Sequence, residues 1–448
     1  MKSMANKSRA RKSRDHRAHI LSIAILLAVF SVFLSGCVQK EEAGEGVKGA
    51  GDEAMKTAEN ATAALPGEIK IGVLQSLTGD LGTYGGPMTD GMKLAAKQLN
   101  ANGGILGKQL VLIVEDDQTN NVAAVDAVNK LVKVDRVPAI IGATGSGPSM
   151  SVIDITTRNG VLQISSSNTG TEFSSYKDND LYFRTASSDS LQGAAMAKLA
   201  GELGYKKAST IVINNPYGVG FEDVFVKAFE AEGGQVLEKV KYDPSQTVFD
   251  SEVQKLADSG ADFIMMVSYP ETGSLILKTA YEKGALKTTP WLLSEGLEAA
   301  NLADLVGKDS EGRYIAAGLQ GLTPDKSAGA KAYESFAEQY VEEYHKDPGI
   351  YCSNSYDALA VVALAMEEAG EATGSAAAAS IRKVANAPGV EVSDLGEALK
   401  LIREGKDINY QGASGEISFD ENGDVSGSYT VWTVAENGTI TYGEKMAV

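Results

Sequence analysis

Histidine and cysteine are nearly absent from this chain of 448 residues, and both absences limit what the protein can do. Two of its three histidines, His16 and His19, fall in the first twenty residues, which leaves His345 alone in the rest. A zinc site built on several histidines is therefore excluded, and a histidine-based catalytic relay is hard to assemble. The two cysteines, Cys37 and Cys352, offer no disulfide framework, so burial of apolar surface must stabilise the fold.

An apolar run over residues 20–34 follows a strongly basic start and ends at the sequence LSGC. The run is shorter than the roughly 20 residues that span a bilayer comfortably. A basic segment, a short apolar segment and small residues before a cleavage point are typical of a secretory signal. LSGC resembles the lipobox of prokaryotic lipoproteins, in which the cysteine (here Cys37) is lipidated after residues 1–37 are processed. An uncleaved membrane anchor remains the alternative. Under both interpretations the chain that follows this segment lies outside the cytoplasm and close to the membrane.

Acidic residues strongly outnumber basic residues beyond this leader. Of 41 basic and 59 acidic residues, the leader holds seven basic ones and one acidic one, which leaves 34 against 58 and a formal net charge of −24. Such a surface repels phosphate backbones, so nucleic acid is not expected as a partner. It is not attracted to anionic lipid either, so attachment must come from the lipid or the apolar run.

The order of expected elements predicts an α/β fold. Residues 38–66 are rich in Glu, Ala, Gly and Lys and are interpreted as a flexible tether. After them, strands alternate with helices of about 10–15 residues, which is typical of parallel sheets covered on both faces. Strands are expected at residues 69–76, 109–116, 138–142, 161–165, 208–214, 235–242, 261–268, 291–294 and 314–318. The helices expected between and after them cover residues 88–99, 122–134, 148–158, 191–203, 220–232, 250–257, 271–283, 328–345 and 355–368.

The pattern restarts after residue 186, which predicts two Rossmann-like three-layer lobes joined by a hinge. We expect lobe 1 to comprise residues 67–187 and 316–414, and lobe 2 to comprise residues 188–315 and 415–448, the latter ending in antiparallel strands. The chain should cross between the lobes near residues 185–188, 314–319 and 412–417. A ligand then belongs between the lobes, because open α/β sheets bind ligands beyond the carboxyl ends of their strands.

The loops at those strand ends are polar in complementary ways. In lobe 1, GATGSGPS (142–149) and SSSNTGTE (165–172) offer hydroxyls and helix N-termini, which attract an anion. In lobe 2, Tyr269 and Glu295 offer an aromatic face and a carboxylate, which suit an ammonium group. An α-amino acid carries both charges, so a cleft between these loops fits one.

Two other interpretations stay open at this point. Ser146 could be a hydrolase nucleophile, although His345 is the one histidine left to serve as its base. Asp116 and Asp117 could hold a metal, or they could anchor a loop at the end of a strand. GATGSGPS is no phosphate loop of the Walker type, because it lacks the Gly-Lys-Ser/Thr ending.

Residues 69–442 resemble the leucine/isoleucine/valine-binding proteins of ABC transporters, which have the type I periplasmic-binding fold. The resemblance is carried by IKIGVLQSLTGDLGTYG, LNANGGILGKQLVLIVEDDQ, IIGATGSG, LYFRTASSDSLQG, DFIMMVSYPETG and WLLSEG, in that order. It implies an extracytoplasmic solute-binding lipoprotein that delivers a small amino acid to an ABC permease. It also implies a protein without catalysis, cofactor or metal, which we expect to be a monomer.

The resemblance also implies a set of ligand-binding residues. Ser146 would hold the ligand's α-carboxylate, and Ser167 and Thr169 would hold the carboxylate and amine. Glu295 would pair with the ammonium group, and Tyr269 would cover the ligand from lobe 2. Three further tyrosines would line the side-chain pocket or the rim of the cleft: Tyr84, Tyr217 and Tyr351.

Some positions depart from the family pattern. Gly145 stands where some members have a disulfide cysteine, Asn168 replaces a small apolar residue, and Ser165-Ser166 replaces a Thr-Pro pair. The pocket is thereby more polar, which leaves the identity of the ligand open. The alternatives are a sensory lipoprotein of the same fold and a binder of an amide, urea or an aromatic acid.

Overall fold

The computed structural model describes residues 67–325 and 330–446 of the chain. The proposed signal (1–37), the lipidation site Cys37 and the tether (38–66) lie outside the described residues. Within them, none of the helices combines the length and apolar character needed to cross a bilayer.

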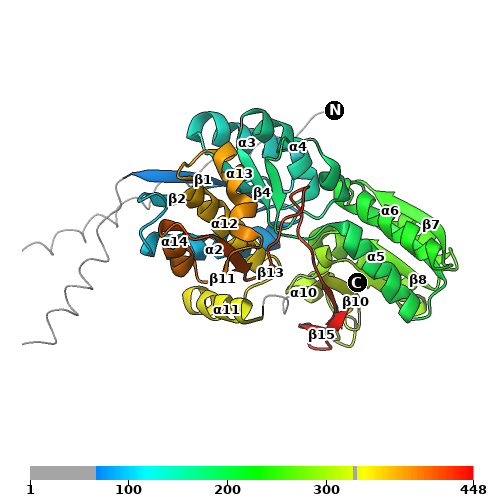
Figure 1. Cartoon of the computed structure of the whole chain (residues 1–448). Helices are drawn as coiled ribbons and strands as arrows, with labels where there is room; N and C mark the ends of the chain where they lie inside the picture. Colours follow the sequence, from blue (N-terminus) through cyan, green and yellow to red (C-terminus); the bar gives the residue numbers. More distant parts are fainter. Residues whose placement is uncertain (1–66, 326–329, 447–448) are drawn as a thin grey trace, which may run out of the picture. The chain divides into compact units, whose positions relative to one another are not determined.

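The first sheet has five parallel strands in the order β2-β1-β3-β4-β5 (Figure 1). Successive side chains of β1 point to opposite faces, as a strand requires. Ile71 and Val73 pack against one group of helices, whereas Leu74 packs against another. The strands are β1 (Glu68–Gln75), β2 (Gln109–Asp116), β3 (Ala139–Gly142), β4 (Leu162–Ser165) and β5 (Tyr182–Arg184).

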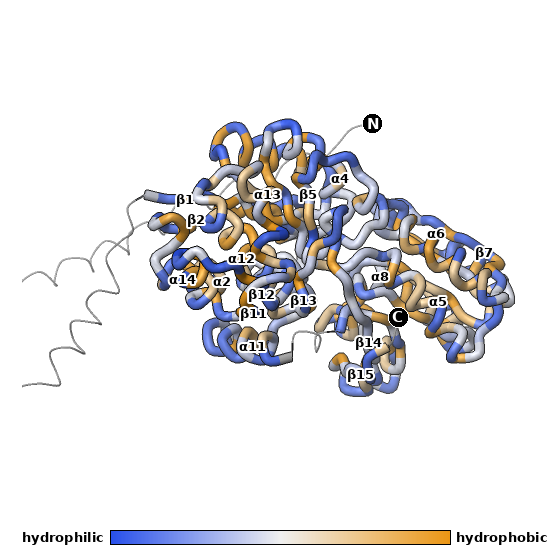
Figure 2. The backbone as a smooth tube through the Cα atoms, in the orientation of Figure 1, coloured by the Kyte–Doolittle hydropathy of each residue, from blue (hydrophilic) through white to orange (hydrophobic). Residues whose placement is uncertain are grey.

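Helices cover both faces of this sheet. The longest apolar helix, α12, lies against α2 and α13, and Figure 2 shows it as hydrophobic, in contrast to the hydrophilic α11. One face carries α2 (Gly82–Ala101), α11 (Ala330–Tyr344), α12 (Cys352–Ala369), α13 (Gly374–Ala385) and α14 (Leu395–Arg403). The other carries α3 (Asn121–Lys130), η2 (Leu131–Asp135) and α4 (Ser146–Arg158), with η3 (Thr171–Ser175) at the edge. A small sheet of β11 (Val390–Val392), β12 (Ile408–Gly412) and β13 (Gly415–Glu416) packs beside α12 and α13.

The second sheet has seven strands in the order β15-β14-β10-β9-β8-β6-β7. Strands β6, β7, β8, β9 and β10 run parallel to one another. Strand β14 pairs antiparallel with β10, and β15 pairs antiparallel with β14. They are β6 (Lys207–Ile213), β7 (Gln235–Tyr242), β8 (Phe263–Val267), β9 (Trp291–Leu293), β10 (Gln320–Pro324), β14 (Tyr429–Val434) and β15 (Ile440–Met446). Their helices are α5 (Asp189–Glu202), α6 (Pro216–Ala231), α7 (Asp250–Ala257), α8 (Pro270–Glu282), α9 (Ala285–Thr288) and α10 (Leu302–Val306). The predicted α/β fold with parallel sheets is confirmed.

Local chemistry explains where several helices begin. The side chains of Asn120, Ser188 and Asn215 accept hydrogen bonds from the first free N–H groups of α3, α5 and α6. Pro216 and Pro270 occupy the first helical position of α6 and α8, where a missing N–H costs nothing.

One expected strand is wrong, and one expected helix begins earlier than predicted. Residues 315–318 form turns, and Tyr314 makes an isolated bridge to Lys308; the strand follows at β10, where it pairs with both β9 and β14. Helix α2 begins at Gly82, earlier than expected, because its first turns contain glycines and Pro87, which mask a helical pattern. Tyr84 therefore lies in the first turn of α2.

The strand positions also move two predicted boundaries of the lobes. Residues 316–324 stay with the seven-stranded sheet, because β10 is one of its central strands. Ile417, Phe419 and Val425 pack in the core around the five-stranded sheet, so lobe 1 continues beyond residue 414. We keep the name lobe 1 for the five-stranded sheet with its helices and lobe 2 for the seven-stranded sheet with its helices. The other predicted bounds stay predictions.

Candidate functional site

A small cavity of about 30 Å³ lies where the carboxyl ends of the strands of both lobes meet. All eight residues singled out from the sequence line it: Tyr84, Ser146, Ser167, Thr169, Tyr217, Tyr269, Glu295 and Tyr351. Four further residues line it: Thr144 and Gly145 belong to the predicted loop GATGSGPS, Gly296 follows Glu295, and Leu81 had no predicted role. The structure thus brings the predicted set together, and its role in binding stays a prediction.

On the lobe 1 side, the cavity meets the N-terminus of α4. Gly145 precedes the helix and has no side chain to cap it, so first-turn N–H groups are left for another partner. The Ser146 hydroxyl donates to Asn168 Oδ1 (2.9 Å) and accepts from the Gly170 N–H (3.2 Å). The Ser167 hydroxyl donates to the Thr144 carbonyl (2.8 Å). This wall is uncharged and carries the partial positive charge of a helix N-terminus, which attracts an anion.

On the lobe 2 side, the cavity meets the carboxylate of Glu295. This residue opens the short helix η4 (Glu295–Leu297) directly after β9, and only 3% of its surface is exposed. Gln192 Nε2 donates to its Oε2 (2.7 Å), and the Tyr217 hydroxyl is a further hydrogen-bond partner. Burial raises the pKa of Glu295 to about 7, although these hydrogen bonds act in the opposite direction.

Tyrosines form much of the remaining wall. The rings of Tyr217 and Tyr269 stack with their centroids 5.5 Å apart, and Asn215 Nδ2 donates to the Tyr269 hydroxyl (3.2 Å). Tyr351 has a left-handed backbone (φ 60°), which is uncommon for a residue other than glycine. Its buried hydroxyl has no hydrogen-bond partner among the described residues. Burying a hydroxyl without a partner costs free energy, and a ligand group that hydrogen-bonds to it would remove this cost.

Hydrogen bonds cross from lobe 1 to lobe 2 beside the cavity. The Tyr84 hydroxyl donates to the Gly296 carbonyl (3.1 Å). The Asp80 carboxylate accepts from Thr272 twice, from its backbone N–H (2.7 Å) and from its hydroxyl (2.6 Å), in the first turn of α8. Gly296 is tightly placed, because a Cβ there would lie 2.5 Å from the Ser268 carbonyl oxygen. The two lobes are therefore joined around the cavity in this structure.

Asp116 and Asp117 are loop anchors rather than a metal pair. Asp116 accepts from the backbone N–H groups of Leu77 and Thr78 and from the Thr78 hydroxyl, and Asp117 accepts from the Ser76 hydroxyl. They hold the loop that leads from β1 toward Tyr84. In the part of the chain that the structure describes, no group of three or more His, Cys, Asp or Glu side chains could hold a metal ion.

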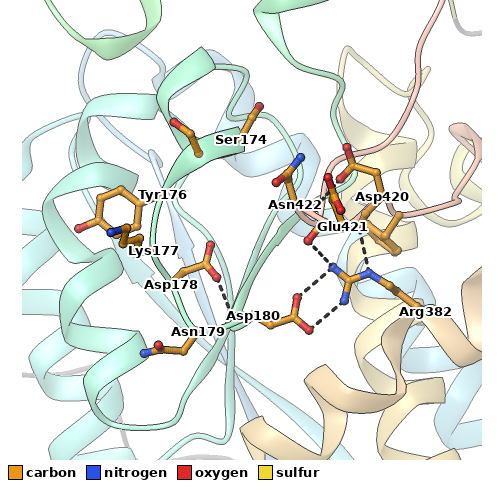
Figure 3. Close-up of a pocket in the computed structure, with 12 residues that line it drawn as sticks. Ser174, Tyr176, Lys177, Asp178, Asn179, Asp180, Arg382, Asp420, Glu421 and Asn422 are labelled. Carbon is orange, nitrogen blue, oxygen red and sulfur yellow. Dashed lines mark hydrogen bonds and ion pairs between the residues drawn. The ribbon is translucent and has the colours of Figure 1, made fainter.

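A larger hollow of about 680 Å³ lies elsewhere on lobe 1, between the segment 174–180 and the turn 419–422 (Figure 3). Arg382 crosses it and binds both carboxylate oxygens of Asp180 (2.9 Å each) and the backbone carbonyls of Asp420 and Glu421. Most of its lining residues are exposed, and its one arginine is already paired with Asp180. A buried cavity with unpaired polar groups is the better binding site, despite its smaller volume.

Comparison with known proteins places this geometry in a family. The model of the family described as "Periplasmic binding protein" matches residues 68–439. The leucine-, isoleucine-, valine-, threonine-, and alanine-binding protein of Pseudomonas aeruginosa is 28% identical over 380 residues, which cover 83% of this chain and 91% of that protein.

Solved structures give the same result. The leucine binding protein LivK of Thermotoga maritima superposes with a TM-score of 0.72 at 26% identity, over 84% of this chain and 98% of that one. A solute binding protein of an ABC transporter from Rhodopseudomonas palustris, in complex with 3,4-dihydroxybenzoic acid, has a TM-score of 0.68 at 19% identity, over 85% and 96% of the two chains. The latter likeness concerns the fold.

Proposed function

Because the chain belongs to the periplasmic binding protein family, whose members are extracytoplasmic solute-binding proteins, we propose that it binds a small amino acid, branched-chain or related, and delivers it to an ABC permease. The observation that carries this proposal is the pairing of opposite charges across one buried cavity. The N-terminus of α4 lies on one side, and the Glu295 carboxylate lies on the other. An α-amino acid carries a carboxylate for the first side and an ammonium group for the second.

Each lining group then has a role. The first-turn N–H groups of α4 bind the α-carboxylate, and the hydroxyls of Ser146, Ser167 and Thr169 turn from their present acceptors to donate to it. Glu295 binds the ammonium group, which compensates the cost of burying the acid. The tyrosines surround the side chain of the ligand: Tyr84, Tyr217, Tyr269 and Tyr351.

Closure of the lobes completes the cycle. Ligand binding favours the joined arrangement because the cavity is formed by both lobes, and opening about the connecting segments releases the ligand to the permease. The bonds from Tyr84 to Gly296 and from Asp80 to Thr272 belong to the closed form. We propose no catalytic step, because the Ser146 hydroxyl donates to the Asn168 amide oxygen, which is not a base.

The N-terminal features complete the proposal. Removal of residues 1–37 with lipidation of Cys37 would attach the protein to the outer face of the membrane, with residues 38–66 as its tether. The protein would act there as a monomer without a cofactor.

The test is calorimetric titration of residues 67–448 with leucine, isoleucine, valine, threonine and alanine, and with 3,4-dihydroxybenzoate. We expect binding of at least one amino acid and none of the aromatic acid, which would leave Glu295 buried without a cation. Glu295→Gln should raise the Kd of the bound amino acid by about 30-fold or more, because removing one partner of a buried charge pair costs about 2 kcal/mol or more. The exposed Glu230→Gln is the matched control and should leave the Kd unchanged. Binding of the aromatic acid with an unaltered Kd in Glu295→Gln would refute the assignment.

A further inference from the structure

A second buried carboxylate lies behind Glu295. Asp189, in the first turn of α5, has no exposed surface. The Thr169 hydroxyl donates to its Oδ2 (2.9 Å), whereas its Oδ1 has no hydrogen-bond partner among the described residues. Neither sequence pattern nor resemblance gave Asp189 a role, although Thr169, its partner, lines the cavity.

Helix α5 connects the two acids. Gln192 lies three residues after Asp189, hence on the same face of the helix, and its Nε2 donates to Glu295 Oε2 (2.7 Å). Asp189 and Glu295 thus share one buried environment. Burial, followed by the negative charge of Glu295, raises the pKa of Asp189 well above its usual value.

Little positive charge compensates the pair. The facing cation is Arg184, and its guanidinium is already bound to Asp424 Oδ2 (2.9 Å) and to the Gly170 carbonyl (2.7 Å). The other titratable groups around the pair and its tyrosines are phenols or acids: Tyr84, Tyr217, Tyr269, Tyr351, Tyr429, Asp80 and Glu298. Two buried carboxylates in one environment, with the guanidinium of Arg184 already bound to Asp424, cannot both be ionised cheaply, and one proton on the pair relieves the repulsion.

We propose that Asp189 and Glu295 share one proton in the empty site and that binding of an ammonium-bearing ligand expels this proton. The inference rests on the proposed function, since it requires a ligand with an ammonium group. The carboxyl O–H bond breaks, its proton passes to solvent, and an N–H of the ligand takes its place as donor to the freed carboxylate. The charge of the pair plus its occupant is the same before and after, because one positive charge replaces another.

This exchange makes the site selective. An ammonium ligand replaces the proton, whereas an amide, urea or aromatic acid carries no cation to replace it. It also fixes the pH dependence of affinity. If binding releases one proton, the Kd falls about tenfold for each unit by which the pH rises. This slope continues up to the pH at which the empty pair loses its proton. Affinity should therefore increase from pH 5 to pH 7 and level off above.

The experiment has two independent readouts. Infrared spectra of the ligand-free protein at pH 6 should contain a protonated-carboxyl band that Asp189→Asn changes. Titration with leucine at pH 6 in phosphate and in Bis-Tris, which both buffer at this pH and differ in ionisation enthalpy, should give close to one proton released per leucine in the wild type. That number should fall toward zero in Asp189→Asn. Asp178, whose pKa is also raised by burial but which lies outside the cavity, gives the control Asp178→Asn, which should leave the proton count unchanged.

The outcomes separate the two proposals. Leucine binding without proton release between pH 5 and pH 7, or an empty site without a protonated carboxyl, overturns the proton exchange and leaves amino-acid binding intact. A protonated carboxyl in a site that binds no amino acid overturns the proposed function while the shared proton stands. The wild-type spectra and proton count decide the matter even where Asp189→Asn fails to fold.

Discussion

The contact between Asp80 and Thr272 makes lobe closure testable by a single substitution. Asp80 lies on the loop after β1, in lobe 1, and its carboxylate takes the place of a cap on α8, in lobe 2. Helix α8 has no side-chain cap of its own, since its preceding residue is Tyr269. The contact exists only while the lobes are together, so its loss should weaken the closed form and leave each separate lobe intact.

The magnitude follows from the two hydrogen bonds. A side-chain cap contributes about 0.5–2 kcal/mol, and a carboxylate at a helix N-terminus adds about 0.3–1 kcal/mol. Asp80 is partly exposed, so we expect the sum of the two contributions to lie in the lower half of its range. Burial also raises the pKa of the Asp80 carboxyl, which reduces the contribution of its charge. We take about 1.5 kcal/mol. If the empty protein is open, Asp80→Ala should therefore raise the Kd for an amino acid by about tenfold.

A double-mutant cycle of Asp80→Ala and Thr272→Val, followed by calorimetry, isolates this contact. The two changes together should raise the Kd hardly more than Asp80→Ala alone, because Thr272→Val removes the hydroxyl bond, which is one of the two hydrogen bonds that Asp80→Ala removes. Small-angle scattering at saturating ligand should show the same closed form in all variants. An unchanged Kd in Asp80→Ala, or two fully additive effects, would refute the role of Asp80 in closure.

Two further predictions concern residues around the cavity and the core. Gly296→Ala should weaken amino-acid binding, measured by calorimetry, because its Cβ would lie 2.5 Å from the Ser268 carbonyl oxygen and displace the segment of lobe 2 that carries Glu295; wild-type affinity would contradict the close packing. Arg184→Ala should lower the free energy of unfolding by about 3–5 kcal/mol in urea, because it leaves the Asp424 carboxylate without its buried partner, whereas Arg158→Ala, which removes an exposed ion pair, should cost less than about 1 kcal/mol. Equal losses in the two arginine variants would show that burial does not determine the strength of these pairs.

The sequence predicts the fold well where each element is marked by its own residues. β8 is a continuous apolar run, β1 and β6 are rich in β-branched residues, and the helices after Asn120 and Ser188 carry their own caps. The pattern fails where a strand is defined by its partners. β10 has the unremarkable sequence QGLTP and becomes a strand because β9 and β14 provide hydrogen bonds on both sides.

The candidate site shows the same limit. The eight predicted residues were found from loop positions and family resemblance, and the structure brings them to one cavity. Asp189 and Gln192 were missed because nothing in the sequence places the start of α5 beside Glu295, which is over 100 residues away. An acidic residue directly after the first crossing between the lobes was the one available signal.

The division of the two cores along the chain bears on the time at which the protein can fold. The core around β1 needs α12 and residues up to Val425, and the core around β6 needs Tyr429 and Trp432 of β14. Neither core can be completed while the last quarter of the chain is still being synthesised. A nascent chain thus emerges without a finished domain and stays open to chaperones and to any translocation machinery until its end is released. Truncation after α12 should accordingly leave no folded lobe, rather than one lobe of two.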